Sequence, residues 1–127
     1  VLGRIIDLLK AHPDLASSMV FLSDHGESLG ENGIYLHGAP YFLAPSTQTQ
    51  VPMVAWFSAG YQAVRPTSTA CLESQRDAKL SHDNLFHTVL GLTDVSTEVY
   101  DASLDAFAAC RSNARAPKLA ANGSPTR

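Results

Sequence analysis

The chain has 127 residues, 45% of them hydrophobic, which is enough to build the core of one domain. No apolar run approaches the roughly 20 residues that a helix needs to span a bilayer. The formal net charge is −3, with acidic and basic residues interspersed. Charge therefore offers no basic stripe for nucleic acid and no polybasic patch for anionic lipid, and no nucleic-acid partner is expected.

The first part of the chain predicts a helix, a strand and a long polar excursion. Apolar residues recur at near-helical spacing over residues 1–9 and Pro13 marks the stop, which predicts a helix that covers a sheet. The continuous apolar run Val20–Leu22 predicts a buried parallel strand, and the carboxyl end of such a strand is where open α/β sheets bind ligands. Residues 39–45 are bracketed by prolines and allow about one helical turn. Residues 46–50 predict a polar linker.

The second part predicts one more strand and one more helix. The apolar run Val51–Phe57 predicts a buried strand with proline near its entry. Residues 58–70 have loop composition. Ser81 precedes an apolar helical pattern and is the expected cap, without a reciprocal partner because Asn84 stands where a capping box has Glu or Gln. Gly91 is expected to end this helix.

Asp24 and His25 stand where the first strand ends, and both are candidate metal ligands. Neighbouring side chains on a straight strand point to opposite faces, so these two converge on one ion only if the backbone bends. Gly26 supplies the conformational freedom for such a bend. Carboxylate oxygen and imidazole nitrogen suit zinc, although two ligands are too few for a stable site. The alternative is an ordinary strand-end turn with a capping Asp24.

The loop that follows returns to a second histidine. Glu27, Gly30, Glu31 and Gly33 make it polar and rich in turns, and it leads back to His37. An ordinary connection has about 4–6 residues, and longer loops that carry histidine and carboxylates are usually functional.

The run FLSDHGESLGENGIYLHG, followed by Pro40-Tyr41 and by Gln50-Val51-Pro52-Met53, closely resembles the catalytic domain of the lipid A phosphoethanolamine transferases. These membrane enzymes are associated with polymyxin (colistin) resistance and belong to the alkaline phosphatase and sulfatase superfamily. Asp-His-Gly after a strand is shared across that superfamily, whereas the complete loop is far more specific to the transferases. The resemblance runs from about Val1 to Arg111 and includes the segment Ser81–His87.

The resemblance implies an α/β fold, the C-terminal portion of an alkaline-phosphatase/sulfatase-like sandwich with a mostly parallel central sheet flanked by helices. Residues 1–110 would then be a partial catalytic domain. Residues 111–127, dominated by Ser, Asn, Ala, Pro, Lys and Gly, would be a disordered C-terminal tail.

Carried over residue by residue, the resemblance makes Asp24 and His25 zinc ligands and places His37 near the phosphate of the transferred group. Glu27 and Glu31 are interpreted as support for the loop or the ligands rather than as ligands themselves. The family's nucleophilic threonine, another metal-binding acid, a further histidine and the membrane anchor are expected upstream of Val1. We therefore expect the chain to be the C-terminal part of a longer enzyme and to be inactive alone.

The activity implied is zinc-dependent transfer of phosphoethanolamine from a phospholipid, phosphatidylethanolamine, to a lipid A phosphate. The catalytic domain would lie on the periplasmic face of the bacterial inner membrane, and no oligomer is expected. Two alternatives stay open. A soluble sulfatase or phosphodiesterase of the same superfamily would use the same Asp24-His25 pair but transfer to water, and a chain complete as given would be a non-catalytic metal-binding fragment.

Cys71 and Cys110 lie outside the metal loop and lack a CxxC spacing, which argues against a zinc knuckle or a thioredoxin-like pair. We predict a disulfide between them, provided that the compartment is oxidising. The resemblance implies the periplasm, where such bonds persist. The alternative is two free buried thiols.

Overall fold

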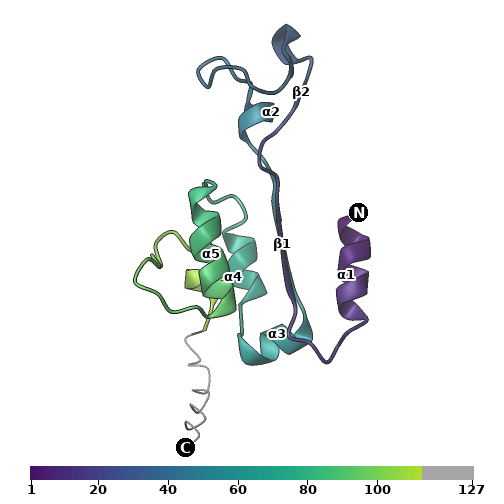
Figure 1. Cartoon of the computed structure of the whole chain (residues 1–127), viewed down its shortest axis with the longest axis vertical. Helices are drawn as coiled ribbons and strands as arrows, with labels where there is room; N and C mark the ends of the chain where they lie inside the picture. Colours follow the sequence, from purple (N-terminus) through teal and green to yellow (C-terminus); the bar gives the residue numbers. More distant parts are fainter. Residues whose placement is uncertain (113–127) are drawn as a thin grey trace, which may run out of the picture. The chain divides into compact units, whose positions relative to one another are not determined.

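The computed structural model describes residues 1–112, which form two compact units (Figure 1). The first unit is Val1–Tyr61, and the second begins at Gln62. No helix in residues 1–112 combines the length and the apolar character needed to span a bilayer. Most of the tail expected at 111–127 lies outside the described residues.

The first unit is built on two paired strands, β1 (Ser18–Leu22) and β4 (Met53–Phe57). They pair antiparallel, with Leu22 opposite Met53, so the expectation of parallel pairing is wrong for these strands. A continuous apolar run indicates that both faces of a strand are covered, but it carries no information about direction. Both strands are half-buried rather than buried. The antiparallel pairing of β1 with β4 brings together the two ends of the long connecting segment, residues 23–52.

The predicted N-terminal helix is confirmed as α1 (Leu2–Lys10). Leu9 near its end lines one hollow together with Trp56 and Phe57 of β4, so the helix and the strand meet there. Its remaining apolar residues are only partly covered, and Leu8 is 63% exposed.

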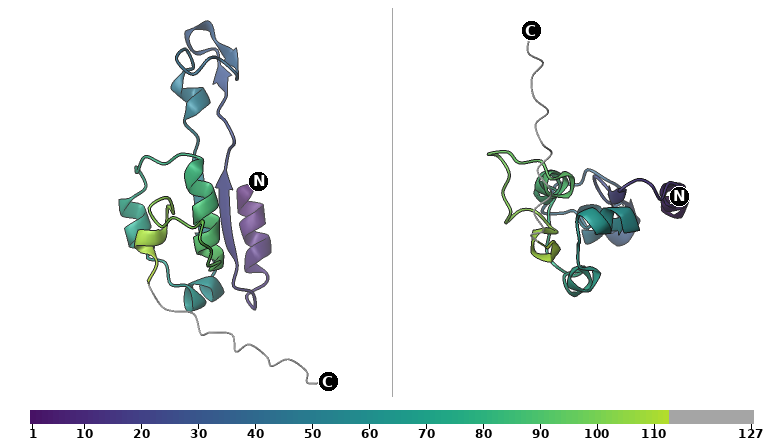
Figure 2. Two further views of the ribbon diagram at one scale, coloured as in Figure 1. Left: turned by 60° about the vertical axis from the view of Figure 1, so that its left-hand side comes forward. Right: turned by 90° about the horizontal axis from the view of Figure 1, so that it is seen from below.

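The excursion between β1 and β4 extends beyond the end of the strand pair and carries short elements of its own (Figure 2). The linker expected at residues 46–50 is mostly helical: Pro45 sits at the N-cap, where its fixed φ suits a helix start, and its carbonyl accepts from the amide of Gln48 at 2.9 Å. The single turn expected after Pro40 is confirmed by two backbone bonds to the Pro40 carbonyl. The elements are β2 (Ser28–Leu29), η1 (Glu31–Gly33), β3 (Tyr35–Leu36) and α2 (Ser46–Thr49).

The loop expected over residues 58–70 instead contains two short helices, α3 (Ala59–Val64) and the start of α4 (Thr69–Ser74). Each begins beside a serine whose hydroxyl accepts a backbone bond. Ser58 accepts from the amide of Tyr61 at 3.0 Å, and Ser68 accepts from that of Cys71 at 3.2 Å. Serine suits turns and helix caps alike, which is why composition pointed to a loop.

The predicted helix after Ser81 is confirmed as α5 (Asp83–Thr93), with two corrections. The Asn84 side chain accepts from the amide of Ser81 at 2.8 Å, while the Ser81 hydroxyl accepts from that of Asp83, so the reciprocal partner is present. Gly91 does not end the helix but is buried within it, and Asp94, with a φ of 58°, is the left-handed cap.

Asp105 anchors the segment that follows α5. Its buried carboxylate accepts from the amide of Phe107 at 2.9 Å and from the hydroxyl of Tyr100 at 2.7 Å, and it pairs with the Arg111 guanidinium. Burial and the Asp105 carboxylate raise the pKa of Tyr100 above its ordinary value. Arg111 also forms an isolated antiparallel bridge with Thr67.

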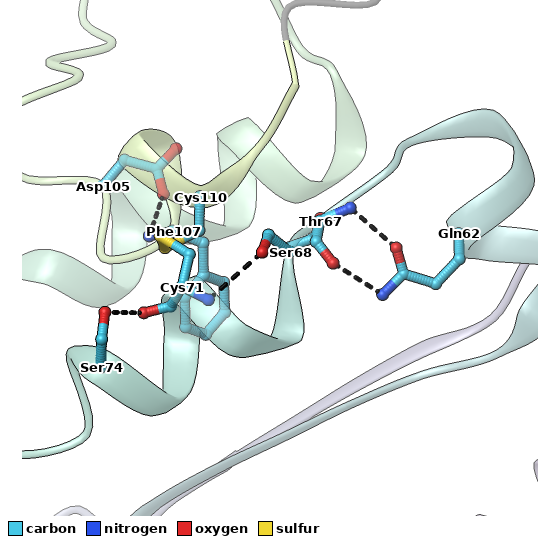
Figure 3. The surroundings of a disulfide bond; sticks show 8 residues. All are labelled: Gln62, Thr67, Ser68, Cys71, Ser74, Asp105, Phe107 and Cys110. Carbon is cyan, nitrogen blue, oxygen red and sulfur yellow. Dashed lines mark hydrogen bonds between the residues drawn. A yellow bond between two sulfur atoms is a disulfide. The ribbon is translucent and has the colours of Figure 1, made fainter.

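The predicted disulfide is present: Cys71 in α4 joins Cys110 in η2 (Ala108–Cys110), with the Cα atoms 5.5 Å apart (Figure 3). Beside it, the Gln62 side chain closes two hydrogen bonds with the backbone of Thr67. The two cysteines are 39 residues apart in sequence, so the bond closes a long loop of the second unit.

Replacing both Cys71 and Cys110 with serine is expected to lower the free energy of unfolding by about 4 kcal/mol in the chain-entropy model, because the unfolded chain regains the freedom of that loop. Thermal unfolding with and without a reductant measures the effect. The serine variant serves as the control, since the reductant should leave its Tm unchanged. A wild-type Tm that does not respond to the reductant would contradict the prediction.

Candidate functional site

The chain bends immediately after β1 and exposes the two predicted ligands. The Ser23 hydroxyl donates to the carbonyl of His25 at 2.8 Å, and the Asp24 carboxylate accepts from the amide of His25 at 3.1 Å. Asp24 Oδ2 lies 3.9 Å from His25 Nε2, although the side chains are adjacent in sequence. The bend thus brings a carboxylate oxygen and an imidazole nitrogen close enough to share an ion.

Gly26 permits this geometry for a reason other than the one expected. Its φ does not lie in the left-handed region; instead the backbone of residues 47–48 passes directly over it. A Cβ at Gly26 would overlap the carbonyl oxygen of Thr47 and lie 2.8 Å from its carbon. The amide of Gly26 donates to the carbonyl of Gln48 at 3.0 Å. Glycine is needed for close approach to α2.

The β2–β3 pair brings Glu27 and His37 together. Ser28 pairs with Leu36, so the residues that flank this pair, one on each arm of the loop, face each other. His37 Nδ1 lies 3.0 Å from Glu27 Oε2, and because a carboxylate only accepts, Nδ1 donates and Nε2 is left for another partner.

His25 completes a cluster with this pair. Its ring stacks on that of His37 with centroids 4.0 Å apart, and its Nδ1 donates to the carbonyl of Gly26 at 2.8 Å, which leaves Nε2 with a lone pair. One donor atom from each of His25, Glu27 and His37 lies within 4.8 Å of the others. No second group of this kind is found among residues 1–112.

The donor set fits zinc. Two imidazoles and two carboxylates are nitrogen and oxygen ligands of the types that zinc takes, and ligand atoms around tetrahedral zinc are separated by about 3.4 Å. The separation of the Asp24 and His25 donors, 3.9 Å, is close to that value, and donor atoms of His25, Glu27 and His37 all lie within 4.8 Å of one another. All four side chains are exposed, so an ion and a substrate have access.

Glu31 serves the turn rather than the cluster. Its carboxylate accepts from the amide of Leu29 at 2.8 Å, across the tip of the loop. The tip and the return arm use left-handed backbone at several residues, including Asn32 and, next to His37, Leu36 with a φ of 64°. A bulky residue adopts that conformation only where its surroundings hold it there.

Gln48 is the residue that sequence reasoning missed. It lies in the predicted polar linker, yet it is 7% exposed and its side chain reaches both arms of the loop. The only signal was a glutamine within a short polar stretch that follows Pro45. Nothing in that stretch indicates burial.

A family model described as Sulfatase matches residues 1–95. The chain belongs to the sulfatase family. Phosphoethanolamine transferase EptA of Escherichia coli strain K12 is 51% identical over 113 residues, which cover 87% of this chain and 21% of that protein. The chain thus spans about a fifth of the length of the curated relatives it matches.

Two solved structures of phosphoethanolamine transferases resemble the chain. The integral membrane protein lipooligosaccharide phosphoethanolamine transferase A from Neisseria meningitidis aligns with a TM-score of 0.78 and 45% identity, over 86% of this chain and 21% of that one. The C-terminal periplasmic domain of phosphoethanolamine transferase EptC from Campylobacter jejuni aligns with a TM-score of 0.71 and 46% identity, over 84% of this chain and 33% of that one.

Proposed function

We propose that this chain carries the metal-binding and phosphate-contacting loop of a zinc-dependent phosphoethanolamine transferase. The enzyme would move phosphoethanolamine from phosphatidylethanolamine to a lipid A phosphate, at the periplasmic face of the bacterial inner membrane, and so confer polymyxin resistance. The observation that carries the proposal is the donor cluster on the loop after β1, in a chain 51% identical to a phosphoethanolamine transferase.

Asp24 and His25 would hold the zinc ion, because their donor atoms are adjacent and His25 already has Nε2 available. Zinc bound there would neutralise charge on phosphoryl oxygens and lower the pKa of a hydroxyl nucleophile. The exposed positions of both side chains leave room for a phosphate group beside them.

His37 would contact the phosphoryl group. Glu27 accepts from Nδ1 and so fixes the orientation of the ring, and with both ring nitrogens protonated Nε2 would donate to a phosphoryl oxygen or give its proton to a leaving oxygen, leaving the neutral ring with its proton on Nδ1. The stacking of the His37 ring on the His25 ring, with centroids 4.0 Å apart, supports a role for His37 beside the proposed metal ligand. The two roles of the loop, metal binding and proton handling, are then carried by adjacent rings.

Replacing His37 with alanine is expected to lower kcat by a factor of ~10²–10⁴, the usual contribution of a positioned proton donor, while zinc content stays near that of the wild type. Zinc is measured by elemental analysis on the same preparation as the kinetics. His12→Ala, which removes another exposed histidine outside the cluster, is the control and should change neither quantity. Loss of zinc from the His37 variant would show that His37 is a ligand instead.

Product analysis tests the function itself. The protein is expressed from its complete reading frame in a polymyxin-sensitive bacterium, and lipid A is examined by mass spectrometry. Lipid A that carries added phosphoethanolamine, together with raised polymyxin resistance, is the expected result. Unmodified lipid A with hydrolysis of a sulfate ester or phosphodiester would instead identify a hydrolase of the same family.

A further inference from the structure

We propose that Gln48 is the positioning residue of this loop: its buried amide ties the two arms together and so sets the spacing of the donors at His25, Glu27 and His37. The inference rests on the proposed function, since it takes the cluster to be the metal and phosphate site. Gln48 lies on α2, outside the loop it organises, and touches neither the donors nor any reacting group in the structure.

The side chain of Gln48 contacts both arms. Its Nε2 donates to the hydroxyl of Ser28 at 2.9 Å on the outgoing arm and to the carbonyl of Leu36 at 3.0 Å on the return arm. Its Oε1 accepts from the amide of Ala39 at 3.3 Å. Both amide hydrogens and the amide oxygen are therefore used.

These contacts fall beside the three donors. Ser28 follows Glu27, and Leu36 precedes His37. The backbone carbonyl of Gln48 accepts from the amide of Gly26, which follows His25. Gln48 thus forms a hydrogen bond with a residue directly adjoining each of His25, Glu27 and His37, although these three residues are not consecutive in the sequence.

These hydrogen bonds are buried, so the loss of one of them is costly. Gln48 is 7% exposed and Ser28 is 1% exposed, so water cannot readily replace a lost partner. Thr47 reinforces the arrangement, because its hydroxyl lies 3.3 Å from that of Ser28. The bond to the Leu36 carbonyl also holds the left-handed backbone immediately before His37, which a leucine does not adopt by preference.

Two substitutions of Gln48 separate its hydrogen bonds from its volume. Gln48→Met keeps the length of the side chain but removes every polar atom. Gln48→Glu keeps the shape and one acceptor but replaces the amide donor with oxygen, which then faces the Leu36 carbonyl with no hydrogen between them. Gln50→Met, an exposed glutamine of the same segment, is the matched control.

The test uses the protein expressed from its complete reading frame, with zinc affinity measured by competition with a chromogenic chelator. Cobalt(II) is then substituted for zinc, because its visible spectrum reports ligand geometry, which a loss of overall stability does not alter. We expect a loss of about 10–100-fold in zinc affinity for Gln48→Met and Gln48→Glu, as is usual for residues that orient ligands, with an altered cobalt spectrum. The route to the metal is the backbone bond from Gly26 to Gln48 beside His25, which loosens when α2 is no longer tied to the two arms. Gln50→Met should match the wild type.

Ser28→Ala provides a second route if the Gln48 variants do not fold, since it removes one of the three side-chain contacts and should weaken zinc affinity to a smaller degree. Wild-type affinity and an unchanged cobalt spectrum in folded Gln48 variants, or in Ser28→Ala when they do not fold, would overturn the inference while leaving the proposed function intact. A wild-type protein that binds neither metal would overturn both.

Discussion

Replacing His25 with alanine is expected to remove the bound zinc and to reduce phosphoethanolamine transfer to background. Its Nε2 lies 3.9 Å from the Asp24 carboxylate and carries a lone pair, while its Nδ1 donates to the Gly26 carbonyl, so no other atom of His25 can act as the ligand. Asp24→Ala should act in the same direction because it removes the adjacent oxygen ligand. A zinc site with few protein ligands does not tolerate the loss of one.

Zinc stoichiometry by elemental analysis and product formation are measured on the same preparations. His12→Ala and Asp14→Ala are matched controls, since each removes the same exposed residue type elsewhere in the first unit and should leave both quantities unchanged. Far-ultraviolet circular dichroism should be unaffected in all four variants. Zinc stoichiometry equal to that of the wild type in both His25→Ala and Asp24→Ala would refute the ligand assignment.

Gly26→Ala is expected to disrupt the site nearly as severely without removing any ligand. The added Cβ would overlap backbone atoms of Thr47, which cannot rotate away as a side chain does. The loop and α2 must then separate, at a cost of about 1–3 kcal/mol or more, and the bond from Gly26 to the carbonyl of Gln48 is lost. We expect a lower Tm together with weaker zinc binding.

Gly3→Ala is the control for this substitution. A Cβ at Gly3 meets nothing within 4 Å, and alanine is favoured over glycine in a helix by about 1 kcal/mol, so this change should leave stability unchanged or raise it. Thermal unfolding and chelator competition measure the two variants side by side. Zinc affinity and Tm equal to those of the wild type in Gly26→Ala would show that the close approach of Gly26 to α2 is not required for zinc binding or for stability.

Elements with strong local signals were predicted well. The 3.6-residue pattern and Pro13 located α1, and the apolar pattern after Ser81 located α5. The direction of β4 was not predictable in the same way, because it depends on how residues 23–52 turn back on themselves. Short helices such as α3 and α4 begin at single serine contacts, and α4 is also joined to η2 by the disulfide, so their local composition resembles that of a loop.

The candidate site could be predicted from the sequence only in part, because some of its contacts join residues that are far apart in the chain. Asp24, His25 and His37 were recognisable as candidates because they stand at a strand end and in a long polar loop. The link between Glu27 and His37 depends on the pairing of β2 with β3, and the role of Gln48 depends on α2 folding against the loop. These contacts join residues about 10–20 positions apart, beyond the reach of local patterns.

Release of diacylglycerol from phosphatidylethanolamine, before and after removal of zinc, is the most direct measure of zinc-dependent transfer by this protein. The protein is expressed from its complete reading frame, treated with a chelator, and assayed with and without restored zinc in the presence of lipid A. We expect release by the untreated protein, none after chelation, and recovery with zinc that fails in His25→Ala. Release that continues unchanged after complete removal of zinc, or that survives in His25→Ala, would contradict this expectation.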